Sequence, residues 1–105
     1  MSDYKLFYMT CKNKVEANKI AYGLVKKDIV ACANIIPNIK SYFKWNKKIN
    51  TANEIIVIGK TTKKNMNKFI SYVKKSSLYE CPCIVFVDII NGNKDFLRWI
   101  KNSTK

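Results

Sequence analysis

The fold of this chain is decided by residues 30–61, which read VACANIIPNIKSYFKWNKKINTANEIIVIGKT. Residues 30–44 and 48–61 are rich in β-branched and aromatic side chains, and Asn46-Lys47-Lys48 between them is typical of a turn. The pattern therefore predicts one long β-hairpin. Two arms of about 14 residues would each extend about 45 Å, at about 3.3 Å per residue.

A hairpin of this length is expected to overhang the rest of the molecule. A globular chain of 105 residues has a diameter of only about 35 Å. Pro37 is expected to introduce a bulge or bend within the first arm. The overhang carries Tyr42, Phe43 and Trp45, which are costly to leave in water. Burial of these three residues against another copy of the chain is the simplest remedy, so we expect an oligomer.

The segments around the hairpin complete an α+β pattern. They predict a strand over residues 5–11, followed by a helix over about 14–27 that begins at Asn13 with Glu16 as its capping-box partner. A second helix is expected to be capped near Thr62, because an apolar stripe follows it: Met66, Phe69, Ile70 and Val73. A strand over 83–90 and a short last helix capped by Asn93 complete the pattern. The order β-α-β-β-α-β plus a helix predicts a ferredoxin-like sandwich, with residues 1–105 as a single domain.

Composition narrows the class of protein. The chain has 48% hydrophobic and 12% aromatic residues, which is enough for a core without disulfides or a metal. It contains no histidine, which excludes His-based catalytic triads and Cys₂His₂ zinc fingers. We see neither a membrane-spanning run nor a readable export signal, so we expect reduced thiols and a cytoplasmic protein.

The net charge of +13 has two interpretations, a solvated lysine surface or a binding site for an anionic partner. Nineteen of the twenty cations are lysine and only Arg98 is arginine, whereas phosphate and base readout favours the guanidinium group. Residues 53–60 also lack the aromatic pattern of an RNA-recognition strand. The sequence therefore argues against nucleic acid as a partner, and a small anionic ligand stays open as the alternative.

Few residues carry recognisable chemistry, and no pair of acidic residues suits general acid and base catalysis, so we expect no enzyme. Met9-Thr10-Cys11 resembles the metal loop of ferredoxin-like copper chaperones, but Lys14 stands where their second cysteine would be. Cys81-Pro82-Cys83 is either a pair of free thiols or a soft-metal site that suits Cu(I). Trp45 has two interpretations, a residue that anchors a subunit interface or one that stacks on a ligand. Lys60 is either a solvated residue at the end of a strand or a positive charge within a binding cleft.

Several segments together resemble the CutA divalent-cation tolerance family. They are Ala31 to Pro37, Ser41 to Trp45 with Lys48-Ile49, Glu54 to Thr61, Tyr79-Glu80-x-Pro82, and Gly92-Asn93 followed by Phe96-Leu97-x-Trp99. The match extends over about residues 5–100. The resemblance implies a tight homotrimer with strands pairing across subunits around the long hairpins. It also implies a role in tolerance of copper and other divalent cations, by weak metal binding.

The same resemblance implies a ligand cleft between subunits, similar to that of PII-like signalling proteins, which bind small anionic ligands. By similarity, the cleft residues are Cys32, Trp45, Lys60, Tyr79 and Glu80. The sequence departs from the family pattern at Ser77, Leu78, Cys83 and Lys47, where the family has His, Pro, Glu and Gly. Either metal binding is lost, or Cys83, with Cys81 and Glu80, offers a softer site.

Overall fold

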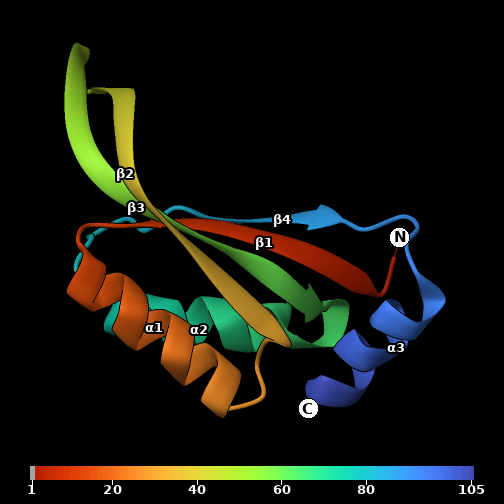
Figure 1. The fold of residues 1–105 in the computed structure, drawn as a ribbon. Helices are drawn as coiled ribbons and strands as arrows, with labels where there is room; N and C mark the ends of the chain where they lie inside the picture. The colour runs from red at the N-terminus through yellow and green to blue at the C-terminus, as the bar shows by residue number, and fades with distance from the viewer. Residues whose placement is uncertain (1) are drawn as a thin grey trace.

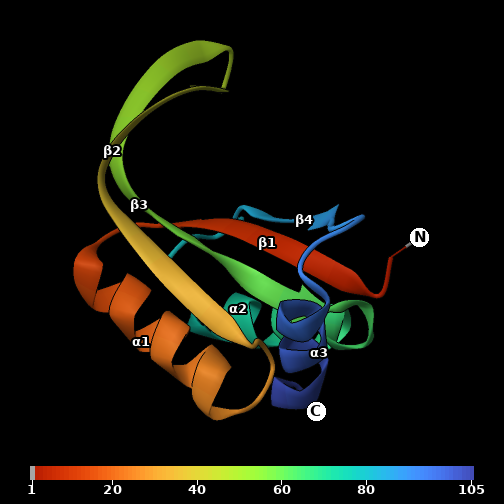
Figure 2. The same ribbon diagram turned by 45° about the vertical axis from the view of Figure 1, so that its right-hand side comes forward.

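The protein forms a four-stranded antiparallel sheet with helices on one face. The computed structural model describes residues 2–105, and its elements are β1 (Tyr4–Cys11), α1 (Lys14–Lys26), β2 (Cys32–Trp45), β3 (Lys48–Thr62), the 3₁₀ turn η1 (Lys63–Asn65), α2 (Met66–Ser76), β4 (Ile84–Asp88) and α3 (Lys94–Ser103). The strand order is β2-β3-β1-β4. Helices α1 and α2 cover one face, and α3 lies at the end of the sheet (Figure 1, Figure 2). The predicted ferredoxin-like α+β fold is confirmed.

The core lies between the sheet and α1 and α2. Phe7, Met9 and Cys11 alternate along β1 and are fully buried, because alternate residues of a strand point to the same face. The ring of Phe69 on α2 lies 4.7 Å from that of Phe7 and 5.2 Å from that of Phe86 on β4, measured between centroids. These three rings join the helix layer to two adjacent strands.

The β2–β3 hairpin overhangs the body, as its length predicts. The molecule measures 44 × 25 × 23 Å along its principal axes, and the far half of the hairpin rises from the sheet and curls away from it (Figure 1, Figure 2). The register shifts between Ile36 and Ile39, where Asn38 adopts a left-handed φ of 63°. This irregularity includes Pro37, so the predicted bulge is confirmed.

Two of the three predicted helix starts are confirmed. The Asn13 side-chain oxygen accepts from the Glu16 N–H at 2.9 Å, and that of Asn93 accepts from the Asp95 N–H at 3.0 Å. The cap at Thr62 is wrong in its detail. Residues 63–65 form η1 before α2 begins, and the Thr62 hydroxyl is buried without a hydrogen-bond partner in the described part of the chain.

Two strands are shorter than predicted. Strand β2 begins at Cys32 rather than residue 30, because Asp28 takes a left-handed φ of 59° and the Val30 N–H bonds back to the Leu24 carbonyl of α1. Strand β4 covers only Ile84–Asp88, since β1 provides partners for those five residues alone. Among residues 2–105, no helix has the length and apolar content needed to cross a membrane.

Candidate functional site

One polar site is built around Glu54 and Tyr79. Glu54 lies on β3 just beyond the bulge, opposite Ile39 of β2. Tyr79 lies in the segment between α2 and β4, and its hydroxyl donates to Glu54 Oε2 at 2.7 Å. Because Tyr79 joins this segment to the root of the overhanging hairpin, the pair fixes the position of the hairpin relative to the body.

The electrostatics of this pair favour an ionised carboxylate and a neutral phenol. Partial burial acts to raise the pKa of Glu54, but hydrogen bonds from Ser41, Tyr79 and Thr10 together outweigh it, and the pKa lies below its usual value. Burial, the hydrogen bond to Glu54 and the negative charge of Glu54 raise the pKa of Tyr79. Near neutral pH, Tyr79 therefore remains a hydrogen-bond donor to a carboxylate.

A second carboxylate, that of Glu16, is hydrogen-bonded to the same segment. Glu16 is only 5% exposed. Its Oε1 accepts from the Lys12 N–H at 2.6 Å, and its Oε2 accepts from the N–H of Leu78, the neighbour of Tyr79. The start of α1 is thereby tied to the segment that carries Tyr79.

Two cysteines adjoin these carboxylates and are poor nucleophiles. Cys11, at the end of β1, is fully buried, and its burial and the charges of Glu16 and Glu54 raise its pKa to about 12. Burial, followed by the charge of Glu54, also raises the pKa of Cys83. Because the thiolate is the reactive form, neither group suits covalent catalysis at neutral pH.

The predicted metal pair occupies an irregular segment. Cys81 is exposed and Cys83 is partly buried, and both precede β4 in non-strand conformation, so a soft ion has access to the Cys81 thiol. Among residues 2–105, no group of three or more His, Cys, Asp or Glu side chains suits a metal ion. An ion held by this chain alone would therefore have two protein ligands. Coordination by two thiolates suits Cu(I), whereas Zn²⁺ takes four ligands in structural sites.

The five predicted cleft residues are divided among three places in one chain. Cys32 and Lys60 are register partners at the body end of the hairpin, and Lys60 Nζ lies 5.9 Å from the ring centroid of Phe96 on α3. Tyr79 and Glu80 lie near Glu54. Along β3, Glu54 is six residues from Lys60, which separates the two positions by about 20 Å. Trp45 lies at the far tip. A single chain therefore does not assemble the cleft.

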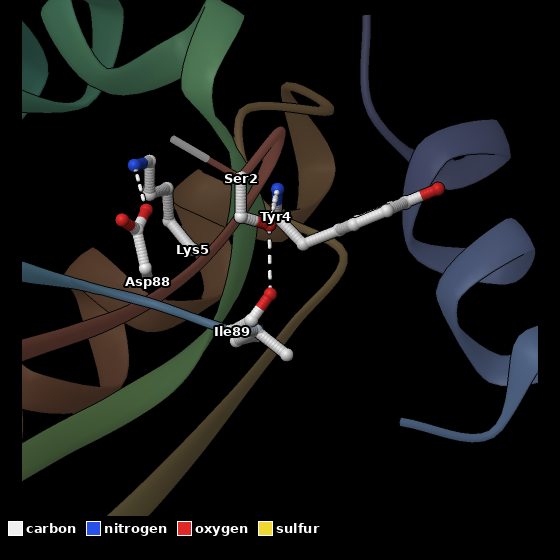
Figure 3. Close-up of polar contacts among 5 residues, drawn as sticks. All are labelled: Ser2, Tyr4, Lys5, Asp88 and Ile89. Atoms are coloured by element: carbon white, nitrogen blue, oxygen red, sulfur yellow. Dashed lines mark hydrogen bonds and ion pairs between the residues drawn. The ribbon is translucent and has the colours of Figure 1, made fainter. Parts of the chain in front are cut away.

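A third polar cluster lies at the other end of β1 and was not predicted. Lys5 is only 3% exposed, and its ammonium group donates to the Asp88 carboxylate of β4. The Ser2 hydroxyl donates to the Ile89 carbonyl at 2.7 Å, and Figure 3 shows both contacts, with the Tyr4 side chain pointing toward α3. The Lys5 side chain, the Ser2 hydroxyl and strand pairing thus fasten β4 to the start of β1.

The sheet face opposite the helices is apolar and uncovered. Alternation along the strands places Leu6 and Tyr8 on this face, beside Ile56 and Ile58 of β3. The same face bears Ile36, Val85 and Val87, which are 43%, 49% and 54% exposed. Sequence reasoning placed the apolar contact surface only at the hairpin aromatics and missed this face, although the continuous apolar runs Leu6 to Met9 and Ile55 to Ile58 are typical of strands that are covered on both sides.

The chain matches one protein family over nearly its whole length. The family model described as CutA1 divalent ion tolerance protein matches residues 5–103. The Divalent-cation tolerance protein CutA of Archaeoglobus fulgidus is 37% identical over 102 residues, which cover 97% of this chain and 99% of that relative. The protein therefore is a member of the CutA1 divalent ion tolerance family, and the resemblance read from its motifs is confirmed.

Plant relatives are longer than this chain. Protein CutA 1, chloroplastic, of Oryza sativa is 33% identical over 98 residues, which cover 93% of this chain but 55% of that relative. Protein CutA, chloroplastic, of Arabidopsis thaliana is likewise covered over 54% of its length. The chain thus spans about half the length of these two relatives.

Solved structures of the family share the fold closely. CutA1 from Oryza sativa superposes with a TM-score of 0.96 at 31% identity, covering 99% of this chain and 95% of that one. The divalent cation tolerance protein from Thermus thermophilus also gives a TM-score of 0.96, at 29% identity, covering 97% and 99%. The Archaeoglobus fulgidus structure, at a TM-score of 0.93 and 37% identity with 97% and 99% coverage, is described as periplasmic, whereas the rice relative is chloroplastic.

Proposed function

We propose that the protein is a non-enzymatic homotrimer that contributes to tolerance of divalent cations, copper in particular, by weak metal binding. The observation that carries this proposal is family membership over residues 5–103. The family description names cation tolerance and no catalytic activity. The buried, high-pKa Cys11 and the absence of histidine support a binding role over a catalytic one.

Two surfaces support assembly with sister subunits. Tyr42, Phe43 and Trp45 are 68%, 43% and 59% exposed in the single chain, which is unfavourable for three large aromatic side chains. The second surface is the uncovered apolar face of the sheet, defined by Leu6, Tyr8 and their neighbours. Closing three copies around these surfaces would bury both and would bring the tip of one chain to the body of the next.

The metal proposal centres on Cys81 and Cys83, with Glu80 alongside. Cys81 is accessible, and two thiolates satisfy Cu(I) without a third ligand from this chain. Because burial and the Glu54 charge raise the pKa of Cys83, the ion must displace a proton from that thiol. Affinity for Cu(I) is therefore expected to increase as the pH rises toward the pKa of Cys83.

Titration of the reduced protein with Cu(I) against a competing chelator tests the metal role. We expect binding by the wild type, its loss in Cys81→Ser/Cys83→Ser, and its retention in the matched control Cys32→Ser. Binding that is unchanged in the double variant, or absent from the wild type, would overturn the metal role. Native mass spectrometry of the same samples reports the number of subunits, and a monomer would overturn the trimer.

A second candidate function is PII-like binding of a small anion between subunits. Lys60 favours it, because this lysine is partly buried and has no ion-pair partner among residues 2–105. In a trimer, Lys60 and Cys32 of one chain would meet Trp45, Tyr79 or Glu80 of another. These are the five residues of the cleft that the resemblance implies.

Thermal shift against nucleotides and small carboxylates separates this function from metal binding. We expect a stabilising ligand whose effect is lost in Lys60→Ala and retained in Lys94→Ala, which removes an exposed lysine of α3. A flat screen, or equal effects in both variants, would contradict the anion site. Neither result bears on Cu(I) binding at Cys81 and Cys83.

A further inference from the structure

We infer that the outer surface of the helix layer binds an acidic polypeptide that also carries apolar side chains. This surface, the basic helix face, is defined by exposed lysines of α1 and α2: Lys14, Lys19, Lys26, Lys68, Lys74 and Lys75. Both helices cover the same side of the sheet (Figure 1, Figure 2). The face is opposite the apolar sheet surface, so subunit assembly there leaves it accessible.

The charged side chains on the basic helix face are almost all positive. Residues 12–28 and 62–76 contain ten lysines and two acidic residues. Of the two, Glu16 is buried and accepts hydrogen bonds from two backbone N–H groups, and Asp28 pairs with Lys105. No acidic side chain in these segments is left to neutralise the lysines of the helices, so the face presents a concentrated positive field.

An apolar ridge runs through the lysines. Val15 and Tyr22 are 79% and 68% exposed and lie seven residues apart on α1, on the side opposite its buried residues. Lys19 and Lys26 share that side, and Lys26 Nζ lies 5.7 Å from the Tyr22 ring centroid. Val25 adds a third exposed apolar side chain, at 42%. The ridge is about 15 Å long, which matches a short peptide segment.

The combination of lysines and an exposed apolar ridge favours one class of anionic partner over the others. A nucleic-acid backbone offers phosphates but no groups that would cover Val15 and Val25, and its readout favours arginine, which the two helices lack. A helix that lies in a bilayer needs a broad apolar face, whereas the apolar side of α1 is already buried in the core. A peptide that alternates acidic and apolar residues satisfies both the lysines and the ridge.

Fluorescence anisotropy at physiological salt tests this inference with labelled poly-Glu and a random Glu/Tyr copolymer. We expect the copolymer to bind more tightly than poly-Glu, and Tyr22→Ser to remove that preference. Lys19→Glu/Lys68→Glu is expected to weaken copolymer binding about tenfold, and Lys94→Glu/Lys101→Glu on α3, with the same change in net charge, is the control.

Three results would overturn the inference. The first is no copolymer binding by the wild type, which would make the face a solvated surface. The second is equal weakening in both charge-reversal variants, which would assign binding to net charge alone. The third is tighter binding of an oligo-dT strand or of anionic phosphatidylserine vesicles than of the copolymer, which would assign the face to nucleic acid or membrane.

Discussion

The root and the tip of the β2–β3 hairpin use the same two strands and the same pairing, yet their environments differ completely. At the root, β3 also pairs with β1, and Ile55 and Val57 are 7% and 0% exposed beneath the helices. Beyond the bulge, only the hairpin's own strands pair, and Tyr42 and Ile49 are 68% and 73% exposed. An isolated two-stranded ribbon is marginally stable in water. The tip is therefore built for contacts that one chain does not supply.

The boundary between the two regions is a local structural change. Between the pairs Ile36–Ile56 and Ile39–Glu54, two residues of β2, Pro37 and Asn38, lie opposite the single residue Ile55 of β3, and the ribbon bends there. Glu54 and Tyr79 meet at this same boundary. The bend and the hydrogen bonds together set the direction in which the tip leaves the body.

Substitutions at the root are expected to have the largest effect. Phe7→Ala removes a fully buried ring that contacts Phe69 and lies under Gly59 of β3. The loss of buried surface and the resulting cavity are expected to lower the free energy of unfolding by about 3–5 kcal/mol. Chemical denaturation checks this value. A change below about 1 kcal/mol would show that the root is not the packed region described above.

Substitutions at the tip are expected to affect association rather than the fold of one chain. Tyr42→Ser/Trp45→Ser removes two exposed aromatic side chains, and each such anchor contributes about 2 kcal/mol or more at an interface. We expect the oligomer to dissociate at least tenfold more readily in light scattering, with an unchanged far-UV circular dichroism spectrum. Val15→Ser/Tyr22→Ser on α1 is the matched control. Equal dissociation in the control would contradict a special role of the tip.

Features encoded by neighbouring residues were predictable from the sequence. The order of the elements along the chain, the overhang, the bulge at Pro37 and the caps at Asn13 and Asn93 depend on local patterns and lengths, and the structure confirms them. The missed start of α2 is also local, since η1 intervenes where a threonine suggested a direct cap.

The polar sites were not predictable, because their partners are distant in sequence. Tyr79 and Glu54 are 25 residues apart, Leu78 and Glu16 are 62 apart, and Lys5 and Asp88 are 83 apart. A lysine beside apolar strand residues normally indicates a solvated position, and only the pairing of β4 with β1 brings Asp88 to Lys5. The predicted cleft residues remain a proposal, because one chain separates them.

The Glu54–Tyr79 contact gives a smaller effect that depends on pH. The folded-state pKa of Glu54 is lowered, so its contribution to stability is present above the unfolded pKa and is lost as the pH falls through the folded pKa. Glu54→Gln is therefore expected to reduce the free energy of unfolding by about 1 kcal/mol at pH 7, since the site is partly exposed, and by progressively less as the pH falls from the unfolded pKa through the folded pKa. Denaturation across pH checks this, with Glu80→Gln as the control. A loss that persists undiminished in acid would contradict the role of the charge.

The smallest expected effect lies in the turn that closes the tip. Asn46 and Lys47 both have left-handed φ angles, of 53° and 63°, and that combination favours Asn-Gly. Lysine in this conformation costs about 1 kcal/mol, whereas glycine avoids the strain but loses more chain entropy on folding. Lys47→Gly is thus expected to raise the free energy of unfolding by about 0.5 kcal/mol. Lys48→Gly, within β3, is expected to lower it by a similar amount. If Lys47→Gly proved destabilising, contacts of the Lys47 side chain with a partner subunit would outweigh the turn strain, and the tip would be bound more closely than its exposure in one chain indicates.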